Sequence, residues 1–315
     1  MRLSDRGRRI TALLTAALAV GAAVFFYEPV SRAWRNATHT PDENGYYQLG
    51  EYWVESLGEL DERSVHTFTR KLNQLAQTEL AGAENLYFAV VPDKGFWGTA
   101  EGWPGPDYER MRQILQEELS GFTQIDLFGS LSLSDYYKTD RHWRQERLQP
   151  VLDALGGAMG FSVSLEDFSA QRSDGFVGAY APYLSGRPPL ESLVYLTNEA
   201  TESAQVEHYP AQEARTVYDI ARLDSENPYD VFLSGASPLV TITCPQASNS
   251  RRLVIFRDSF ASSLAPLLCG QYRTITLVDL RYLSSALLPQ FLDADGCDVL
   301  FLYSTWVVNN SAMLR

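Results

Sequence analysis

The sequence predicts an α/β domain with a mostly parallel sheet and an irregular, β-rich insertion, preceded by one N-terminal transmembrane helix. Three observations predict it. Continuous apolar runs such as Asn85–Val91 (NLYFAVV) are typical of strands buried on both faces. Such runs alternate with helical patterns at both ends of the domain, which favours crossover units. An uncharged run from Ile10 to Tyr27 follows a cluster of arginines.

The uncharged run is near the lower length limit of a bilayer-spanning helix. Its basic flank (Arg2, Arg6, Arg8 and Arg9) favours a cytoplasmic N-terminus and an extracytoplasmic domain, so the expected localisation is a single-pass cell-membrane protein. A cleaved signal peptide is the alternative, but no small-x-small pair ends the run. We therefore expect a cytoplasmic tail at 1–9, a signal anchor at 10–28, a juxtamembrane linker at 29–58 and the folded domain at 59–315.

The formal net charge is −13, and residues 1–9 carry +3, which leaves −16 for the remainder. A polyanion such as nucleic acid is therefore not expected to bind through the overall field. No His-Glu-x-x-His, Cys-x-x-Cys, P-loop or Gly-x-Gly-x-x-Gly motif is present, so neither a metal nor another cofactor is expected. Cys244 and Cys269 could form a disulfide in an oxidising compartment, which would leave Cys297 free.

The first α/β part begins with an amphipathic helix over Glu59–Leu80, on which His66 is expected to be partly buried. A strand at Asn85–Val91 follows, then a helix at Pro106–Leu119 and a strand at Phe122–Phe128. After the first strand, Asp93-Lys94 is interpreted as a turn with a surface ion pair, although a role in the site stays open. Trp97 and Trp103 in the next loop fit either a substrate-facing rim or core packing.

A further helix is predicted within Asp135–Leu155 from its apolar stripe, with Pro150 as the discordant residue. Asp140-Arg141-His142-Trp143 then lies in the loop or first turn that leads into it. Residues 162–237 change to short alternating runs, including Leu193–Thr197, Gln205–Tyr209 and Arg215–Ile220, and are interpreted as an irregular β insertion.

The last part returns to α/β texture, with strands predicted at Leu253–Phe256, Thr274–Val278 and Val299–Tyr303 and helices at Ala261–Leu268 and Ser284–Phe291. Ser259 lies at the turn between the first of these strands and its helix. Such a turn exposes a nucleophilic hydroxyl at the carboxyl edge of a parallel sheet, but Asp258 or Ser259 could equally serve as a helix cap. Asp279 and Arg281 follow the next strand and fit a structural salt bridge or a substrate contact.

A nucleophilic serine needs a base, and the chain has four histidines, at 39, 66, 142 and 208. Only His142 follows an Asp by two residues in a loop between a predicted strand and helix. A carboxylate at that spacing can orient the imidazole, although a structural histidine beside Trp143 is the simpler interpretation of this motif alone.

The motifs Asp140-Arg141-His142-Trp143 and Phe256-Arg257-Asp258-Ser259-Phe260 together resemble the DHHW family, and through it the SGNH-hydrolase-like proteins of alginate O-acetylation. The resemblance extends over residues 45–310 and includes Val90–Lys94, Tyr136–Thr139, Tyr229-Asp230 with Gly235, and Leu277–Tyr282. It implies an SGNH-like three-layer domain with Ser259 as nucleophile, His142 as base and Asp140 as the residue that orients it. The chain departs from the family name at Arg141, which we expect to affect the rim of the site. The ordinary Gly and Asn blocks are absent, so the Ser259 N–H needs a second oxyanion donor, for which Gly235, Arg281 and Asn310 are candidates.

The resemblance further implies an extracytoplasmic serine acyl-transfer enzyme, an O-acetyltransferase of an exported polysaccharide or cell-wall glycan. A membrane-bound O-acyltransferase would be the partner that supplies acetyl groups. Two alternatives remain from the sequence: a carbohydrate acetylesterase, and a catalytically idle glycan-binding scaffold of the same fold.

Overall fold

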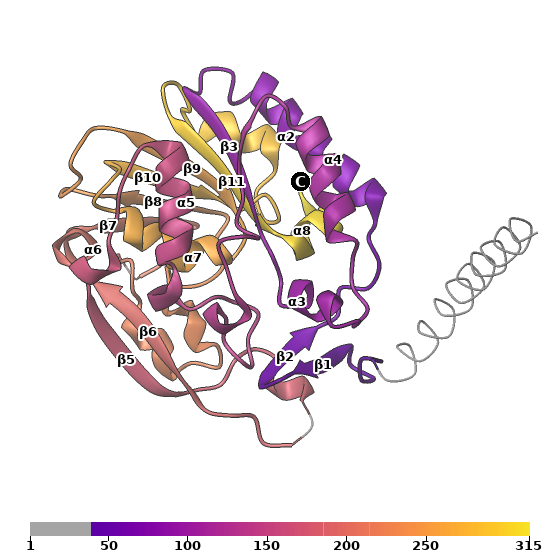
Figure 1. The fold of residues 1–315 in the computed structure, drawn as a ribbon. Helices are drawn as coiled ribbons and strands as arrows, with labels where there is room; N and C mark the ends of the chain where they lie inside the picture. The colour runs from indigo at the N-terminus through magenta and orange to yellow at the C-terminus, as the bar shows by residue number, and fades with distance from the viewer. Residues whose placement is uncertain (1–38, 185, 214) are drawn as a thin grey trace, which may run out of the picture.

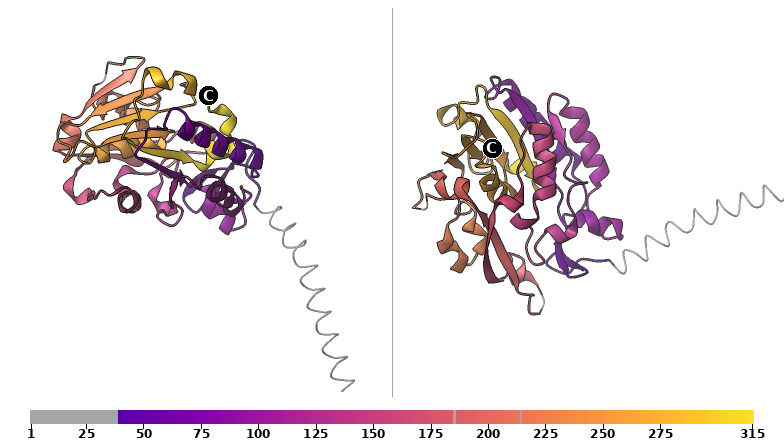
Figure 2. Two further views of the ribbon diagram at one scale, coloured as in Figure 1. Left: turned by 90° about the horizontal axis from the view of Figure 1, so that it is seen from above. Right: turned by 60° about the vertical axis from the view of Figure 1, so that its left-hand side comes forward.

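A seven-stranded sheet with helices on both faces forms the centre of the computed structural model, which describes residues 39–184, 186–213 and 215–315 (Figures 1 and 2). The strand order is β4-β3-β11-β9-β10-β8-β7. The five strands from β4 to β10 run parallel, and β8 pairs antiparallel with both β10 and β7. The expected tail at 1–9 and signal anchor at 10–28 lie outside the described residues. None of the helices in the described part has the length and apolar character of a bilayer span.

Two antiparallel pairs, β1 with β2 and β5 with β6, stand apart from the main sheet. The strands are β1 (Tyr46–Leu49), β2 (Tyr52–Glu55), β3 (Asn85–Val91), β4 (Thr123–Ile125), β5 (Ser169–Phe176), β6 (Glu191–Thr197), β7 (Gln205–Tyr209), β8 (Leu239–Thr243), β9 (Arg252–Arg257), β10 (Thr274–Val278) and β11 (Asp298–Ser304). The α-helices are α2 (Glu62–Gln77), α3 (Gly95–Ala100), α4 (Tyr108–Glu118), α5 (Gln149–Met159), α6 (Glu199–Ser203), α7 (Phe260–Leu264) and α8 (Thr305–Asn309).

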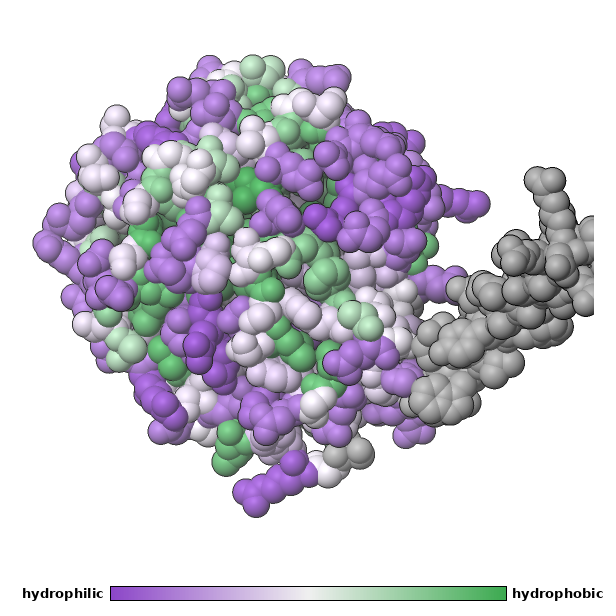
Figure 3. Space-filling model, in the orientation of Figure 1, coloured by the Kyte–Doolittle hydropathy of each residue, from purple (hydrophilic) through white to green (hydrophobic). Residues whose placement is uncertain are grey.

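Each face of the sheet buries its own apolar core. Along β3, Tyr87, Ala89 and Val91 belong to one core while Phe88 and Val90 belong to the other, as the alternation of side chains along a strand requires. Helices α5 and α7 cover the first face, and α2, α4 and α8 cover the second. The outer surface over α2 and α4 is mostly hydrophilic (Figure 3). The predicted mostly parallel α/β arrangement is thus observed.

The residues interpreted as a β-rich insertion at 162–237 divide between two structures. Strands β5 and β6 form a separate hairpin, but β7 joins the main sheet as its edge strand beside β8. The alternating run at Arg215–Ile220 forms no regular strand: it has an isolated bridge between Tyr218 and Phe232, followed by a 3-10 helix from Ile220. Short alternating runs identified β7 but gave no information about which sheet it joins.

The segment expected as a linker at 29–58 contains the β1–β2 hairpin, so folded structure begins before residue 59. Tyr47, Leu49 and Val54 form a small core there, against which Trp97 and Trp103 pack. The Trp103 ring stacks on that of Tyr47 with 4.1 Å between centroids, which supports core packing for this tryptophan.

The three cysteines are buried and free, so the disulfide considered between Cys244 and Cys269 is absent. A hydrogen bond with Cys244, together with burial, instead raises the pKa of the Cys269 thiol.

Candidate active site

Ser259 follows β9 at the carboxyl edge of the parallel strands and occupies the N-cap position of α7. Its hydroxyl makes no capping hydrogen bond. Asp258 organises the turn instead: its Oδ1 accepts the N–H of Phe260 at 3.1 Å, and its Oδ2 accepts the N–H of Ser304 at 2.8 Å. Ser259 Oγ is therefore available to a partner from elsewhere in the chain.

That partner is His142, whose Nε2 lies 2.7 Å from Ser259 Oγ. On the other side of the ring, Nδ1 lies 2.6 Å from Asp140 Oδ1. An ionised Asp140 places the imidazole proton on Nδ1, so that Nε2 can accept the serine proton. Asp140, His142 and Ser259 thus form a continuous chain of hydrogen bonds, which we call the Asp140–His142–Ser259 relay.

The Asp140 carboxylate is 1% exposed and accepts two backbone hydrogen bonds in addition to its contact with the imidazole ring. The N–H of His142 donates to Oδ1 at 2.9 Å, and the N–H of Ala179 donates to Oδ2 at 2.8 Å. Burial acts to raise the pKa of Asp140, but His142 and these N–H donors outweigh it and hold the pKa well below its ordinary value. Asp140 is therefore ionised at neutral pH, as an orienting carboxylate must be.

Aromatic rings fix the plane of the imidazole. The Tyr229 ring stacks on His142 with 3.9 Å between centroids and 7° between planes. Its hydroxyl donates to Ser263 Oγ at 2.8 Å, and Trp143 Nε1 donates to the same oxygen at 2.9 Å. Ser263 therefore ties both aromatic residues to the helix that begins after Ser259.

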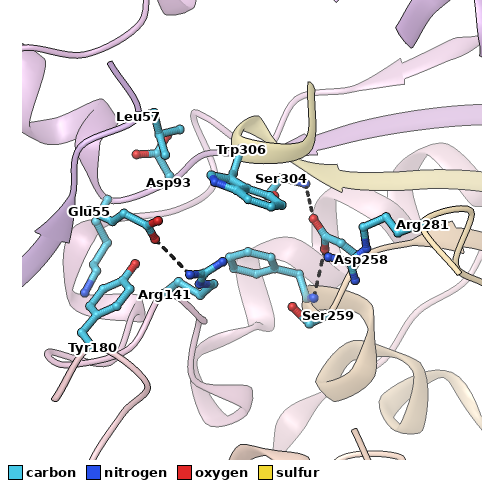
Figure 4. A pocket seen from close by; sticks show the side chains of 12 residues that line it. Glu55, Leu57, Asp93, Arg141, Tyr180, Asp258, Ser259, Arg281, Ser304 and Trp306 are labelled. Carbon is cyan, nitrogen blue, oxygen red and sulfur yellow. Dashed lines mark hydrogen bonds and ion pairs between the residues drawn. The ribbon is translucent and has the colours of Figure 1, made fainter. Parts of the chain in front are cut away.

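A pocket that is partly open to solvent lies beside Ser259 (Figure 4). Tyr180 and Trp306 contribute aromatic walls, with the Arg141 guanidinium 5.9 Å from the first ring centroid and 5.7 Å from the second. Arg141 also pairs with Glu55 at 3.1 Å. The full lining is Glu55, Leu57, Asp93, Lys94, Arg141, Tyr180, Asp258, Ser259, Phe260, Arg281, Ser304 and Trp306.

The three oxyanion candidates differ in their placement. Arg281 lines the pocket, and its Nε and Nη2 bind Asp279 at 2.9 and 2.6 Å, so the salt bridge considered for this pair is present. Gly235 and Asn310 are not among the pocket-lining residues. The Gly235 N–H donates to the Phe232 carbonyl, and the exposed Asn310 carboxamide donates to the Trp306 carbonyl.

Asp93 and Lys94 do not form a surface ion pair, contrary to the interpretation of their sequence. Lys94 is 2% exposed and lines the pocket. Burial lowers its pKa to about 7, although the carboxylates of Asp140, Glu191, Asp93 and Glu55 act in the opposite direction. Asp93 is bound by Tyr108, Thr305 and the N–H of Gly95, and burial raises its pKa.

Several residues of the site carried no signal in the sequence. Ala179 belongs to the insertion and contributes only a backbone N–H, for which any residue type would serve. Glu55 and Leu57 come from the segment expected as a linker, and Trp306 follows the last strand.

His66 is partly exposed and pairs with Glu118 at 2.7 Å, in agreement with a structural role. In the described residues, no group of three or more His, Cys, Asp and Glu side chains is arranged to hold a metal ion.

No protein-family model matches the sequence, and neither does any curated protein. Solved structures do match. A DHHW family protein from Eubacterium siraeum superposes with a TM-score of 0.71 at 17% identity, over 86% of this chain and 94% of that one. The chain has the fold of a DHHW protein.

Two further structures share this DHHW fold. Bacillus cereus PatB1, solved with a sulfonyl adduct, matches with a TM-score of 0.64 at 18% identity, over 84% of this chain and 97% of that one. The O-acetyltransferase domain of Pseudomonas putida AlgJ matches with a TM-score of 0.50 at 12% identity, over 84% of this chain and 92% of that one. The resemblance to SGNH-like alginate O-acetylation proteins is therefore a resemblance of fold.

Proposed function

We propose that this chain is a membrane-anchored, extracytoplasmic serine O-acetyltransferase that acts on an exported polysaccharide or cell-wall glycan. The observation that carries the proposal is the Asp140–His142–Ser259 relay beside an open pocket. The fold shared with the O-acetyltransferase domain of AlgJ supports this choice of reaction.

In the first half-reaction, Ser259 Oγ attacks the carbonyl carbon of an acetyl donor while His142 Nε2 accepts the hydroxyl proton. The tetrahedral intermediate then expels the donor's leaving group, which takes the proton from His142. Acetyl-Ser259 remains. In the second half-reaction, a sugar hydroxyl gives its proton to His142 and attacks the acetyl carbonyl. The bond from Ser259 Oγ to the acetyl carbon then breaks, and Oγ takes the proton from His142, which releases the acetylated sugar and restores Ser259.

The developing oxyanion needs donors at the nucleophile. We assign the Ser259 N–H as one donor and the Arg281 guanidinium as the other. Arg281 shares the pocket with Ser259 and is anchored by Asp279 through Nε and Nη2, whereas Gly235 and Asn310 donate elsewhere.

The pocket suits a sugar acceptor because aromatic rings flank polar groups there. Trp306 and Tyr180 offer apolar faces. The Arg141 guanidinium offers hydrogen-bond donors and the Glu55 carboxylate offers an acceptor. A membrane-bound O-acyltransferase would supply the acetyl groups, and the membrane would be reached through residues 10–28.

Covalent labelling tests the nucleophile. The wild-type protein is expected to react with a fluorophosphonate probe and to cleave 4-nitrophenyl acetate. Ser259→Ala should lose both reactions, and His142→Ala should reduce them by about 10³-fold or more because the serine loses its base. His66→Ala is the matched control, since His66 lies on α2 away from the pocket and should retain wild-type rates.

Failure of the folded wild-type protein to label would contradict the enzymatic proposal and favour an idle glycan-binding scaffold. Where labelling succeeds, the fate of the acetyl group distinguishes the two reactions. Acetylated oligosaccharide in the presence of a glycan acceptor supports the transferase, whereas release of acetate alone supports the esterase.

A further inference from the structure

The backbone segment that leads into Asp140 is held by two buried side chains of opposite charge. Lys94 Nζ donates to the carbonyl oxygens of Tyr137 and Lys138 at 3.0 and 3.2 Å. Glu191 Oε2 accepts the N–H groups of Lys138 and Thr139 at 2.8 and 3.2 Å. Lys94 follows β3 and Glu191 begins β6, so distant parts of the chain hold the same three residues.

These contacts satisfy backbone groups of a loop and not those of a regular element. Lys94 is 2% exposed and Glu191 8% exposed, which makes their hydrogen bonds stronger than solvated ones. Removing Lys94 takes away the side-chain donor of the Tyr137 carbonyl, whereas the Lys138 carbonyl still accepts the Trp53 N–H at 2.8 Å. Removing Glu191 takes away the acceptor of two buried N–H groups. Glu191 Oε1 is itself fixed by Arg144 Nη2 at 2.9 Å. Lys94 Nζ also lies 4.9 Å from the centroid of the Tyr180 ring, which adds a cation–π contact.

The insertion completes the support from the other side of the loop. The N–H of Gly178 donates to Thr139 Oγ1 at 2.9 Å, and the N–H of Tyr180 donates to the Thr139 carbonyl at 3.0 Å. The next acceptor along the chain is Asp140, which receives the N–H of Ala179. A shift of the segment 137–139 would therefore move the carboxylate that orients His142.

Burial of two charged groups is a weak source of stability, because the loss of hydration offsets much of the gain from their contacts. Apolar side chains would fill the same space without that cost. The groups that these two side chains bind explain why they are charged. Lys94 binds the carbonyls of residues 137 and 138, and Glu191 binds the N–H groups of residues 138 and 139. Together these contacts fix both the position and the direction of the segment.

We propose that Lys94 and Glu191 are positioning residues that hold the backbone of residues 137–139, so that Asp140 and His142 align with Ser259. The proposal rests on the function proposed above for the Asp140–His142–Ser259 relay. Lys94 and Glu191 act through the loop and do not take part in acetyl or proton transfer.

The experiment measures, in the full-length protein, the second-order rate of fluorophosphonate labelling across pH, kcat and KM for 4-nitrophenyl acetate, and Tm. Lys94→Met and Glu191→Gln are compared with wild type. We expect labelling and kcat to fall by about tenfold or more, with KM within about twofold, because misalignment weakens proton transfer more than it weakens substrate binding.

The chain offers a control for each variant. Lys71→Met removes a lysine that donates to Ser285 away from the site, and Glu51→Gln removes an exposed partner of the Lys138 side chain. Both controls should label at wild-type rates. Lys94→Arg retains donors for the two carbonyls and should recover a substantial part of the lost rate.

A spectroscopic readout separates alignment from simple loss of stability. The proton between His142 Nδ1 and Asp140 should give a strongly deshielded NMR signal in wild type, which should shift or broaden in Lys94→Met while Tm remains above the assay temperature. Unchanged labelling in both folded variants would overturn the proposal while leaving the proposed function intact. Loss of fold together with labelling would assign a structural role and also overturn it, whereas an unreactive wild-type protein would refute the proposed function itself.

Discussion

Ser259 occupies a capping position without capping, and its sequence context alone could not reveal this. A serine after a strand and before a helix suits either role. The outcome depends on Asp258, which accepts the N–H of Phe260 at the start of α7, and on His142, which lies 117 residues away in the chain. Sequence reasoning could nominate Ser259, His142 and Asp140, but only tertiary structure brings them within hydrogen-bonding distance.

Lys94 shows where residue-level prediction failed. Pro92-Asp93-Lys94-Gly95 has the composition of an exposed turn, yet the loop before His142 covers it and Lys94 Nζ binds carbonyls there. Turn composition reports local backbone conformation and contains no information about which distant segment packs over the turn.

Burial of Lys94 should make stability depend on pH. Its folded pKa of about 7 lies below the ordinary value of 10.5, so between these values the unfolded chain binds more protons and the free energy of unfolding rises with pH. The carboxylates of Asp140, Glu191, Asp93 and Glu55 face it and temper the effect. Relative to Lys94→Met, the wild type should gain stability from pH 7 to pH 9, by at most about 1.4 kcal/mol per pH unit. Urea unfolding at the two pH values measures this difference, and a constant difference would contradict the lowered pKa.

At the scale of elements, the strands were the most accessible to prediction. The predicted bounds Asn85–Val91 and Thr274–Val278 are those of β3 and β10, because both strands are buried and bounded by turn residues. The β1–β2 hairpin was missed because its four-residue strands are too short to display a period. Helix α7 is continued by a 3-10 helix at Ala265–Leu268, where Pro266 lacks the N–H that an α-helix would use.

Pro150, the discordant residue of the predicted helix, lies in the first turn of α5, where a backbone N–H has no helical acceptor. Pro150→Ala should therefore change the free energy of unfolding by less than about 1 kcal/mol. Leu152→Ala, two residues later and 1% exposed, should cost about 2–5 kcal/mol because it opens a cavity in the core. Urea titration of the two variants compares them directly, and a larger loss for Pro150→Ala would contradict this placement.

At the scale of the whole molecule, the α/β class and the mostly parallel sheet followed from alternating buried strands and helices. The order of the strands did not, because β11 from the end of the chain inserts between β3 and β9. The sequence pattern also did not predict which segments form the pocket wall, which combines the early hairpin, the Arg141 loop and the segment after β11. Sequence periodicity describes each element but not its neighbours.

The membrane topology that we propose also concerns the whole molecule. Alkaline phosphatase fused after Arg315 should be active in a bacterial host, because residues 10–28 are proposed to export the domain. The fusion should sediment with membranes if the anchor is retained and appear in the soluble extracytoplasmic fraction if it is cleaved. A fusion lacking residues 1–28 is the control and should be inactive; an inactive full-length fusion would contradict the proposed topology.

The long separation between His142 and Ser259 has a consequence for how the protein folds. The relay joins residues 117 positions apart and also needs Ala179 from the insertion, so it forms only after the costly closure of long loops. During refolding, secondary structure should recover before Ser259 becomes reactive. Ser259 would then stay unreactive until the domain is assembled and His142 lies beside it. The rate at which the refolding protein becomes reactive to a serine-directed probe would report the last step of folding.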